Sequence, residues 1–278
     1  MRTSTIIIAA IAIAIAGVVR GVSAANDERM LVVCSPGSPG TSERAQPRMD
    51  AFAAAIAAKA GQPLAAVYEP TDAGGVKRFA SASLGIVSLP FFLAREHELG
   101  LHAQLEAVQQ GRPSLEQWTL VAQKGRVARA EQLAGMTIVS DAGFDPEFVR
   151  GAIAQLGPVP AGATIVQSSA VLPALRRAAR GEPVAVLLDG PQAASLGSLP
   201  FAGKLEAVTT SPAWPAGIVV TVGTKLSATA WAPFERALLG LGGEPSGATA
   251  LNALEVDHFA PLDRAALDSA RTSFVKAR

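Results

Sequence analysis

The chain has 278 residues, of which 49% are hydrophobic and 17% charged, and its formal net charge at pH 7 is +1. Lysine and arginine are scattered along it, which argues against a nucleic-acid surface or a polybasic membrane patch, since both need a concentrated positive field. After the segment described next, no stretch approaches membrane-spanning length without a charge or a proline, and about 250 residues are enough for two lobes with separate cores.

Residues 1–24 have the pattern of a signal peptide. Arg2 supplies a positive charge, residues 6–19 form an unbroken apolar stretch, and Val22-Ser23-Ala24 supplies small residues for cleavage. A membrane anchor is the alternative, but the apolar stretch is shorter than the ~20 residues needed to cross a bilayer. We therefore expect a periplasmic protein.

The single cysteine, Cys34, cannot form an internal disulfide. It ends the apolar run Met30–Cys34 and precedes a Pro-Gly turn, which predicts a buried strand residue rather than a reactive free thiol. It also lies too far beyond the apolar stretch at the N-terminus to indicate lipidation.

Short apolar runs alternate with helical patterns along the first two thirds of the chain, as in βαβ units, and predict the α/β fold class. The runs are Met30–Cys34, Leu64–Tyr68, Leu84–Leu89, Met136–Ser140, Thr164–Gln167 and Val184–Leu188.

Three turns are predicted to follow strands at their carboxyl ends, where open α/β sheets bind ligands. The first, residues 35–42, precedes a helix that carries Met49, Phe52 and Ile56 at helical spacing and ends at Gly61. The second includes Phe144, placed to pack on Val149, and leads to a helix whose N-cap is Asp145 and whose first residue is Pro146. The third follows Leu188 and begins with Asp189-Gly190-Pro191, which is also a turn formula.

The remaining chain predicts further strands and helices. A helix behind Ser168 and Ser169 carries Val171, Leu172, Leu175 and Ala178 and stops at Gly181. Strands follow at Leu205–Val208 and Gly217–Val222, then a helix with Trp231, Phe234, Leu238 and Leu241, and a last helix over about Leu262–Val275. No flexible linker or repeat occurs, so ordered crossing strands must join any lobes.

Three segments carry a family resemblance. Glu131–Val139 is similar to the pattern "dL.Gk.va" that begins a second lobe, Ala174–Glu182 is similar to "al.aV..GevDa", and Val208–Pro215 looks like the return to the first lobe. In this order they resemble the phosphate/phosphonate/phosphite type of periplasmic substrate-binding protein, over most of the mature chain.

The resemblance implies a two-lobed, type 2 periplasmic-binding-protein fold with the ligand cleft at the hinge. One lobe would be residues 25–116 plus 212–278 and the other residues 117–211, with Trp118–Gln123 as a crossing strand. The protein would be a monomer that delivers its ligand to the membrane permease of an ABC-type importer, which senses the closed lobes.

A phosphonate-like or phosphate-like anion would be held by backbone N–H groups at helix N-termini and by hydroxyl groups. The candidate ligand-binding residues for any ligand are Ser35, Gly37, Ser38, Thr41, Ser88, Phe91, Ser140, Asp141, Phe144 and Asp189. Ordinary turn and capping roles are the alternative for each serine and threonine.

Several of these residues depart from an anion site. Asp141 would repel an anion, and Asp189 could accept a hydrogen bond from a hydroxyl or an amine. The predicted loop Pro90-Phe91-Phe92 after Leu84–Leu89 would supply apolar surface near the cleft, with buried packing of both rings as the alternative, and Phe144 would supply a further aromatic side chain. A neutral, cationic or lipid-like ligand therefore remains open, as does a sensing role in which occupancy is passed to a partner receptor instead of a transporter.

The sequence favours a binding protein over an enzyme. It contains no Gly-x-Ser-x-Gly elbow, no phosphate-binding Walker loop and no GxGxxG motif. The histidines His97, His102 and His258 lack the spacing of a zinc site and are expected to be exposed. We expect no catalytic residue, metal or cofactor.

Overall fold

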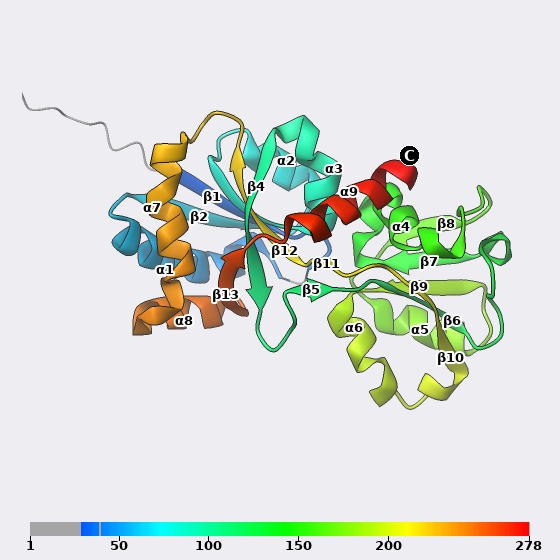
Figure 1. Cartoon of the computed structure of the whole chain (residues 1–278). Helices are drawn as coiled ribbons and strands as arrows, with labels where there is room; N and C mark the ends of the chain where they lie inside the picture. Colours follow the sequence, from blue (N-terminus) through cyan, green and yellow to red (C-terminus); the bar gives the residue numbers. More distant parts are fainter. Residues whose placement is uncertain (1–28, 39, 278) are drawn as a thin grey trace, which may run out of the picture.

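The computed structural model describes residues 29–38 and 40–277, and the predicted signal peptide lies outside these residues. The described chain forms two large β-sheets, each flanked by helices, which lie side by side (Figure 1). The α/β fold class is confirmed.

The larger sheet has six strands in the order β13-β4-β12-β3-β1-β2. Its strands are β1 (Arg29–Cys34), β2 (Leu64–Glu69), β3 (Leu84–Ser88), β4 (Leu101–Gln109), β12 (Gly217–Val222) and β13 (Val256–Pro261), and its helices are α1 (Ser42–Ala60), α2 (Asp72–Phe79), α3 (Leu89–Leu99), α7 (Ala228–Leu239) and α8 (Pro245–Ala253). Strand β1 is parallel to β2 and β3, whereas β12 is antiparallel to β3 and β4. The sheet is therefore mixed.

The smaller sheet has five strands in the order β10-β6-β9-β7-β8. Its strands are β6 (Thr119–Gln123), β7 (Thr137–Ser140), β8 (Thr164–Gln167), β9 (Val184–Leu188) and β10 (Leu205–Thr210), with the helices α4 (Pro146–Ala152), α5 (Val171–Ala179) and α6 (Gly190–Ser195). Strand β9 at the centre is buried along its whole length.

The capping residues act as their types predict. Gly61 ends α1 in the left-handed conformation, with φ of 67°, and its N–H donates to the carbonyl of Ala57. Asp145 accepts from the N–H of Glu147 at 3.1 Å and Pro146 begins α4. These local predictions are confirmed.

Two local predictions were wrong. The segment after β3 is not a loop: Pro90 lies in the first turn of α3, and the ring of Phe91 stacks on Phe79 with centroids 5.8 Å apart. Asp189-Gly190-Pro191 is not a simple turn either, because the Asp189 carboxylate accepts from the N–H of Gln192 at 2.8 Å and caps α6.

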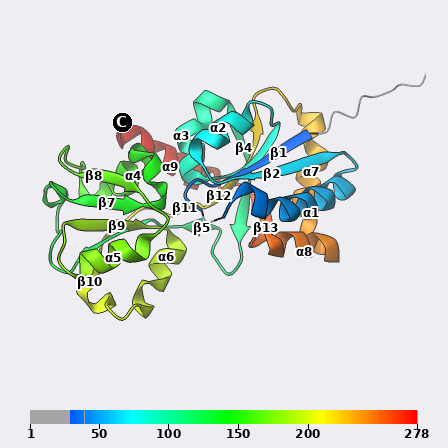
Figure 2. The ribbon, with the colours of Figure 1, turned by 180° about the vertical axis from the view of Figure 1, so that it is seen from behind.

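The two sheets are joined by a short ribbon in which β5 (Leu115–Glu116) pairs with β11 (Trp214–Pro215). The chain leaves the larger sheet through β5 and returns through β11 (Figure 2). Trp214 in this ribbon is fully buried and meets the ring of Phe148 of α4, 6.1 Å away. The crossing point is therefore packed as a hydrophobic core.

A third connection is the last helix, α9 (Arg264–Ala277), which runs from the larger lobe to α4 of the smaller lobe (Figure 1). On the side of the larger sheet, Arg271 donates two hydrogen bonds to Glu96 of α3, at 3.1 and 2.5 Å, and its guanidinium lies 5.5 Å from the ring centre of Phe92. On the other side, a Cβ added at Gly151 of α4 would lie 3.0 Å from the carbonyl oxygen of Ser273. Helix α9 is thus fastened to one lobe and closely packed on the other.

The close approach of α4 and α9 predicts a stability effect. Gly151→Val is expected to lower the free energy of unfolding by about 1–3 kcal/mol, because the new side chain has no room beside the backbone of α9. Urea unfolding measures this change. The control is Gly203→Val, since nothing lies within 4 Å of a Cβ added there; equal losses in both variants would contradict the prediction.

Candidate ligand-binding cleft

A cleft of about 660 Å³ lies where the two lobes and the crossing ribbon meet. The larger lobe contributes the turn after β1, the first residues of α1 and the end of β3, and the smaller lobe contributes the segments after β7 and β9. The carboxyl ends of parallel strands from both sheets therefore face one space, as expected for ligand sites in α/β folds.

Seven of the ten candidate residues line this cleft: Ser35, Gly37, Ser38, Thr41, Ser88, Asp141 and Asp189. The other three lie outside its lining. Phe91 is fully buried in the core, Ser140 is buried with its hydroxyl accepting from the N–H of Ala142 at 3.3 Å, and Phe144 packs half-buried against the core. Each of these three side chains is used in packing or capping.

The wall from the larger lobe is rich in hydrogen-bond donors. The hydroxyls of Ser35 and Ser38 are 2.8 Å apart, and Thr41 caps α1 by accepting from the N–H of Arg44 at 3.4 Å. Ser88 precedes α3, and its buried Oγ has no hydrogen-bond partner among the described residues. Two helix N-termini and the side chains of Arg44 and Arg48 thus give this wall a positive character.

The opposite wall carries three carboxylates. Asp141 follows β7, Asp189 follows β9, and Glu116 lies on the crossing strand β5. Burial, then the charge of Asp189, raises the pKa of Asp141 to about 6, and the same two causes raise the pKa of Glu116 to about 7. Burial also raises the pKa of Asp189. These groups lack a partner that would stabilise their negative charge fully.

The side chain of Gln192 connects Asp141 to Asp189 through two hydrogen bonds. Asp141 accepts from the side-chain amide of Gln192 at 3.1 Å, and the Gln192 carbonyl oxygen in turn accepts from the N–H of Asp189 at 3.2 Å. Among residues 29–38 and 40–277, no three His, Cys, Asp or Glu side chains are placed to hold a metal ion. His97, His102 and His258 are exposed, as predicted.

Sequence reasoning missed Glu116, Trp118 and Gln192 as cleft residues. Glu116 and Trp118 are two residues apart on an extended segment, so their side chains point to the same side of it, and both line the cleft. Trp118 is only 4% exposed, and its indole N–H has no hydrogen-bond partner within the described part of the chain. A buried donor of this kind indicates a missing acceptor.

Cys34 also lines the cleft but is 0% exposed, which confirms its predicted burial in a strand. Its burial, followed by the charges of Glu69 and Asp72, raises the pKa of the thiol. Burial and these charges therefore favour the protonated thiol over the thiolate.

The two lobes approach each other closely at Gly37, in the turn after β1. A Cβ added at Gly37, whose φ is 89°, would lie 2.6 Å from the carbonyl oxygen of Asp141. Only glycine allows both this left-handed conformation and this approach.

Two α/β lobes joined by crossing strands around a cleft are the arrangement of the two-lobed periplasmic-binding-protein fold. No family model and no curated protein matches the chain. Solved structures do match it along most of its length.

Among these is XAC2383 from Xanthomonas citri bound to ATP, with a TM-score of 0.69, 14% identity, and coverage of 90% of this chain and 98% of that chain. A binding-protein component of an ABC phosphonate transporter from Pseudomonas aeruginosa has a TM-score of 0.63, 16% identity, and coverage of 90% and 87%. PhnD1 from Prochlorococcus marinus, in complex with methylphosphonate, has a TM-score of 0.61, 11% identity, and coverage of 89% and 98%. At these identities the likeness concerns the fold.

The contact at Gly37 predicts an effect on closure. In Gly37→Ala the new methyl group would collide with the Asp141 carbonyl, so the lobes should separate and the radius of gyration should rise by roughly 1 Å from the ~18 Å expected at this length. Small-angle X-ray scattering measures this. Gly40→Ala is the matched control, because Gly40 also has a positive φ, 109°, but nothing within 4 Å. An unchanged radius in Gly37→Ala would contradict the prediction.

The raised pKa of Glu116 predicts a pH-dependent stability. Between its ordinary pKa of 4.5 and its folded pKa of about 7, the folded protein binds more protons than the unfolded chain, so this contribution to stability is lost as the pH rises through that window. Glu116→Gln should therefore raise the free energy of unfolding by about 1–3 kcal/mol more at about pH 8 than at about pH 4.

Urea unfolding of the ligand-free protein at both pH values tests this expectation. Glu131→Gln, a change at an exposed residue, serves as the control. If both variants show the same pH dependence as the parent protein, Glu116 is not the source of the effect.

Proposed function

We propose that the chain is a periplasmic solute-binding protein of an ABC-type importer, which closes its two lobes around a small molecule and catalyses no reaction. The lobes would comprise residues 25–116 plus 212–278 and residues 117–211. Residues 1–24 would direct export, and the closed monomer would dock on the permease. The described residues contain no helix long and apolar enough to span a membrane.

The division of charge across the cleft carries the proposal about the ligand. Donors and helix N-termini line the larger lobe's wall, whereas Glu116, Asp141 and Asp189 line the opposite wall. A phosphonate-like or phosphate-like group suits the first wall because N–H and hydroxyl donors bind such anions. The charge of Arg112, which also lines the cleft, lowers the pKa of Glu116 and of Asp189 but does not offset the effect of burial, so a bare anion would leave the three carboxylates without a full counter-charge.

The ligand we propose therefore has an acidic group for the larger lobe and an amine for the carboxylates. Solved structures with this fold support the acidic part, since one is a component of a phosphonate transporter and another holds methylphosphonate. The raised pKa values of Asp141 and Glu116 support the basic part, since a bound ammonium group would stabilise the ionised carboxylates.

Calorimetric titration with 2-aminoethylphosphonate and ethylphosphonate at about pH 8 tests the proposal. The amine should tighten binding about 10-fold or more, the value of a hydrogen bond between charged groups. Asp141→Asn should remove most of this difference, while Asp268→Asn, on the exposed face of α9, should preserve it.

Equal affinity for both phosphonates would refute the amine contact. Absence of binding by either compound would refute the ligand class. A rise in melting temperature on adding the amino compound would be independent support, because selective binding to the folded state stabilises it.

A further inference from the structure

The charged residues that line the cleft fall into two groups by their exposure. The three carboxylates of the inner wall are half-buried, whereas the other charged residues in the described lining are exposed: Arg44, Arg48, Arg112 and Glu255. We call these four residues the cleft margin. With three arginines against one glutamate, the margin is positive where the cleft meets solvent, and the negative groups lie deeper.

The cleft margin belongs to the larger lobe. Helix α1, which carries Arg44 and Arg48, packs on α8, and Glu255 follows the end of α8. The N–H of Gln110, next after β4, donates to the carbonyl oxygen of Glu255 at 2.9 Å, and Arg112 follows two residues later. The elements that carry the margin are therefore adjacent in the fold.

Arg44 and Arg48 are placed against the preferences of their own helix. Arg44 lies in the first turn of α1, where the helix dipole disfavours a positive charge. Arg48 lies four residues later, so the two guanidinium groups are neighbours on one face and repel each other. Neither forms an ion pair within residues 29–38 and 40–277. Such local conflicts are typical of positions that bind something else.

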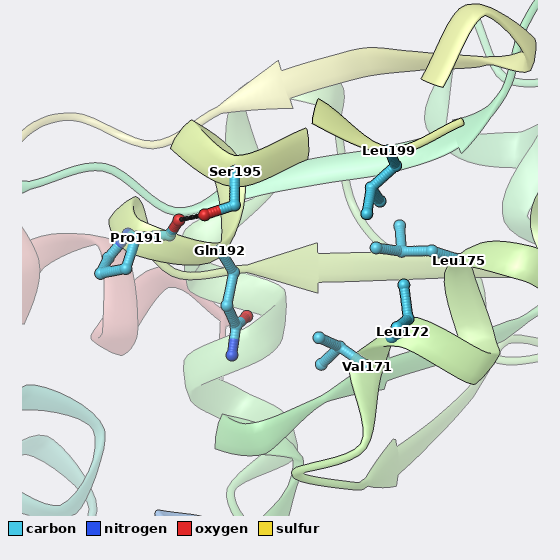
Figure 3. A pocket seen from close by; sticks show the side chains of 7 residues that line it. All are labelled: Val171, Leu172, Leu175, Pro191, Gln192, Ser195 and Leu199. Atoms are coloured by element: carbon cyan, nitrogen blue, oxygen red, sulfur yellow. Dashed lines mark hydrogen bonds between the residues drawn. The ribbon is translucent and has the colours of Figure 1, made fainter. Parts of the chain in front are cut away.

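The cleft has room for a larger ligand, whereas the neighbouring cavity is closed off from it. That cavity, of about 290 Å³, lies between α5 and α6 (Figure 3) and shares only Gln192 with the cleft. The side chain of Gln192 is held there by Asp141 and by the N–H of Asp189. The cleft itself, at about 660 Å³, lies within the ~300–1,000 Å³ of sites that hold drug-sized molecules. A two-carbon aminophosphonate would leave much of it to solvent.

We propose that the cleft margin binds a second acidic group of the ligand through Arg44 and Arg48. The inference rests on the proposed solute-binding function and narrows its ligand class to phosphonates or phosphate esters that carry another acidic group several bonds away. The first acidic group would lie deeper, at the half-buried residues Ser35, Ser38 and Ser88.

The chemistry of the margin favours an acidic group over a neutral one. A guanidinium group donates paired hydrogen bonds to a carboxylate or a phosphate, and a bound anion would relieve the repulsion between Arg44 and Arg48. The charge of Glu255 opposes such a group. We therefore assign the contact to the two arginines of α1 and not to the whole margin.

Calorimetric titration with two matched series at about pH 8 tests this inference. One series is 3-phosphonopropionate, 4-phosphonobutyrate and 5-phosphonopentanoate, and the other is the three compounds with the carboxyl group replaced by a neutral amide. For the spacer that fits best, the acid should bind about three- to tenfold more tightly than its amide, between the values of an exposed ion pair and of a hydrogen bond between charged groups. Arg44→Gln and Arg48→Gln should each lower this acid-to-amide ratio at least twofold.

The matched control is Arg176→Gln. This change also removes one positive charge from an exposed helical residue, but Arg176 lies on α5 of the other lobe and does not line the cleft. The ratio should therefore stay at the value of the parent protein.

The outcomes separate this inference from the proposed function. If the compounds bind but no acid binds more tightly than its amide, or if all three arginine variants lower the ratio equally, the margin assignment is wrong while the solute-binding proposal stands. If Arg44→Gln and Arg48→Gln weaken acid and amide to the same extent, these arginines act on the first acidic group, and the assignment is again wrong. If no compound of either series binds, both the assignment and the proposed ligand class are wrong.

Discussion

Three carboxylates share one cleft, and the cost of removing their charges from water governs how the two lobes behave. Bringing Glu116, Asp141 and Asp189 together in a water-poor space is unfavourable unless protons or a positive group compensate their charge. In the proposed binding protein, closure over an empty cleft would therefore carry an electrostatic cost that closure over a suitable ligand would not. A ligand that lowers this electrostatic cost would favour the closed form over the open form, by as much as it lowers the cost.

In the proposed binding protein, the strands that join the lobes would transmit this effect of the ligand. Glu116 belongs to the strand by which the chain leaves the larger sheet, so one of the charged groups in the cleft is also part of the connection between lobes. Trp214 on the return strand and helix α9 pack the same junction from the other side. Relative motion of the lobes would therefore shift the contacts among these elements.

Much of the fold could be predicted from the sequence, because buried parallel strands are continuous apolar runs and because caps such as Gly61 and Asp145 act locally. Strand β4 was missed because Gln104 and Glu106 interrupt its apolar pattern. Glu106 is nevertheless buried, and its carboxylate accepts from the N–H of Asp263 at 2.6 Å, a partner 157 residues away. No local pattern reveals such a partner.

The site was predictable only in part, for the same reason. Strand-end residues such as Asp141 and Asp189 are found from the order of strands alone. Glu116, Trp118 and Gln192 belong to the cleft because two sheets meet there, and that depends on packing across the hinge. Proline followed by two aromatic residues predicts a loop with Phe91 at the cleft, whereas Pro90 lies in the first turn of a helix that turns the ring of Phe91 into the core.

The order of strands in the larger sheet has a consequence for how the chain matures. Strand β12 lies between β3 and β4, so the N-terminal segments cannot complete their sheet until residues 217–222 have been synthesised. Helix α9, which joins the lobes, is made after all the other described helices and strands. The nascent chain therefore stays without its finished core through most of its synthesis, a state that suits a protein proposed to cross a membrane before it folds.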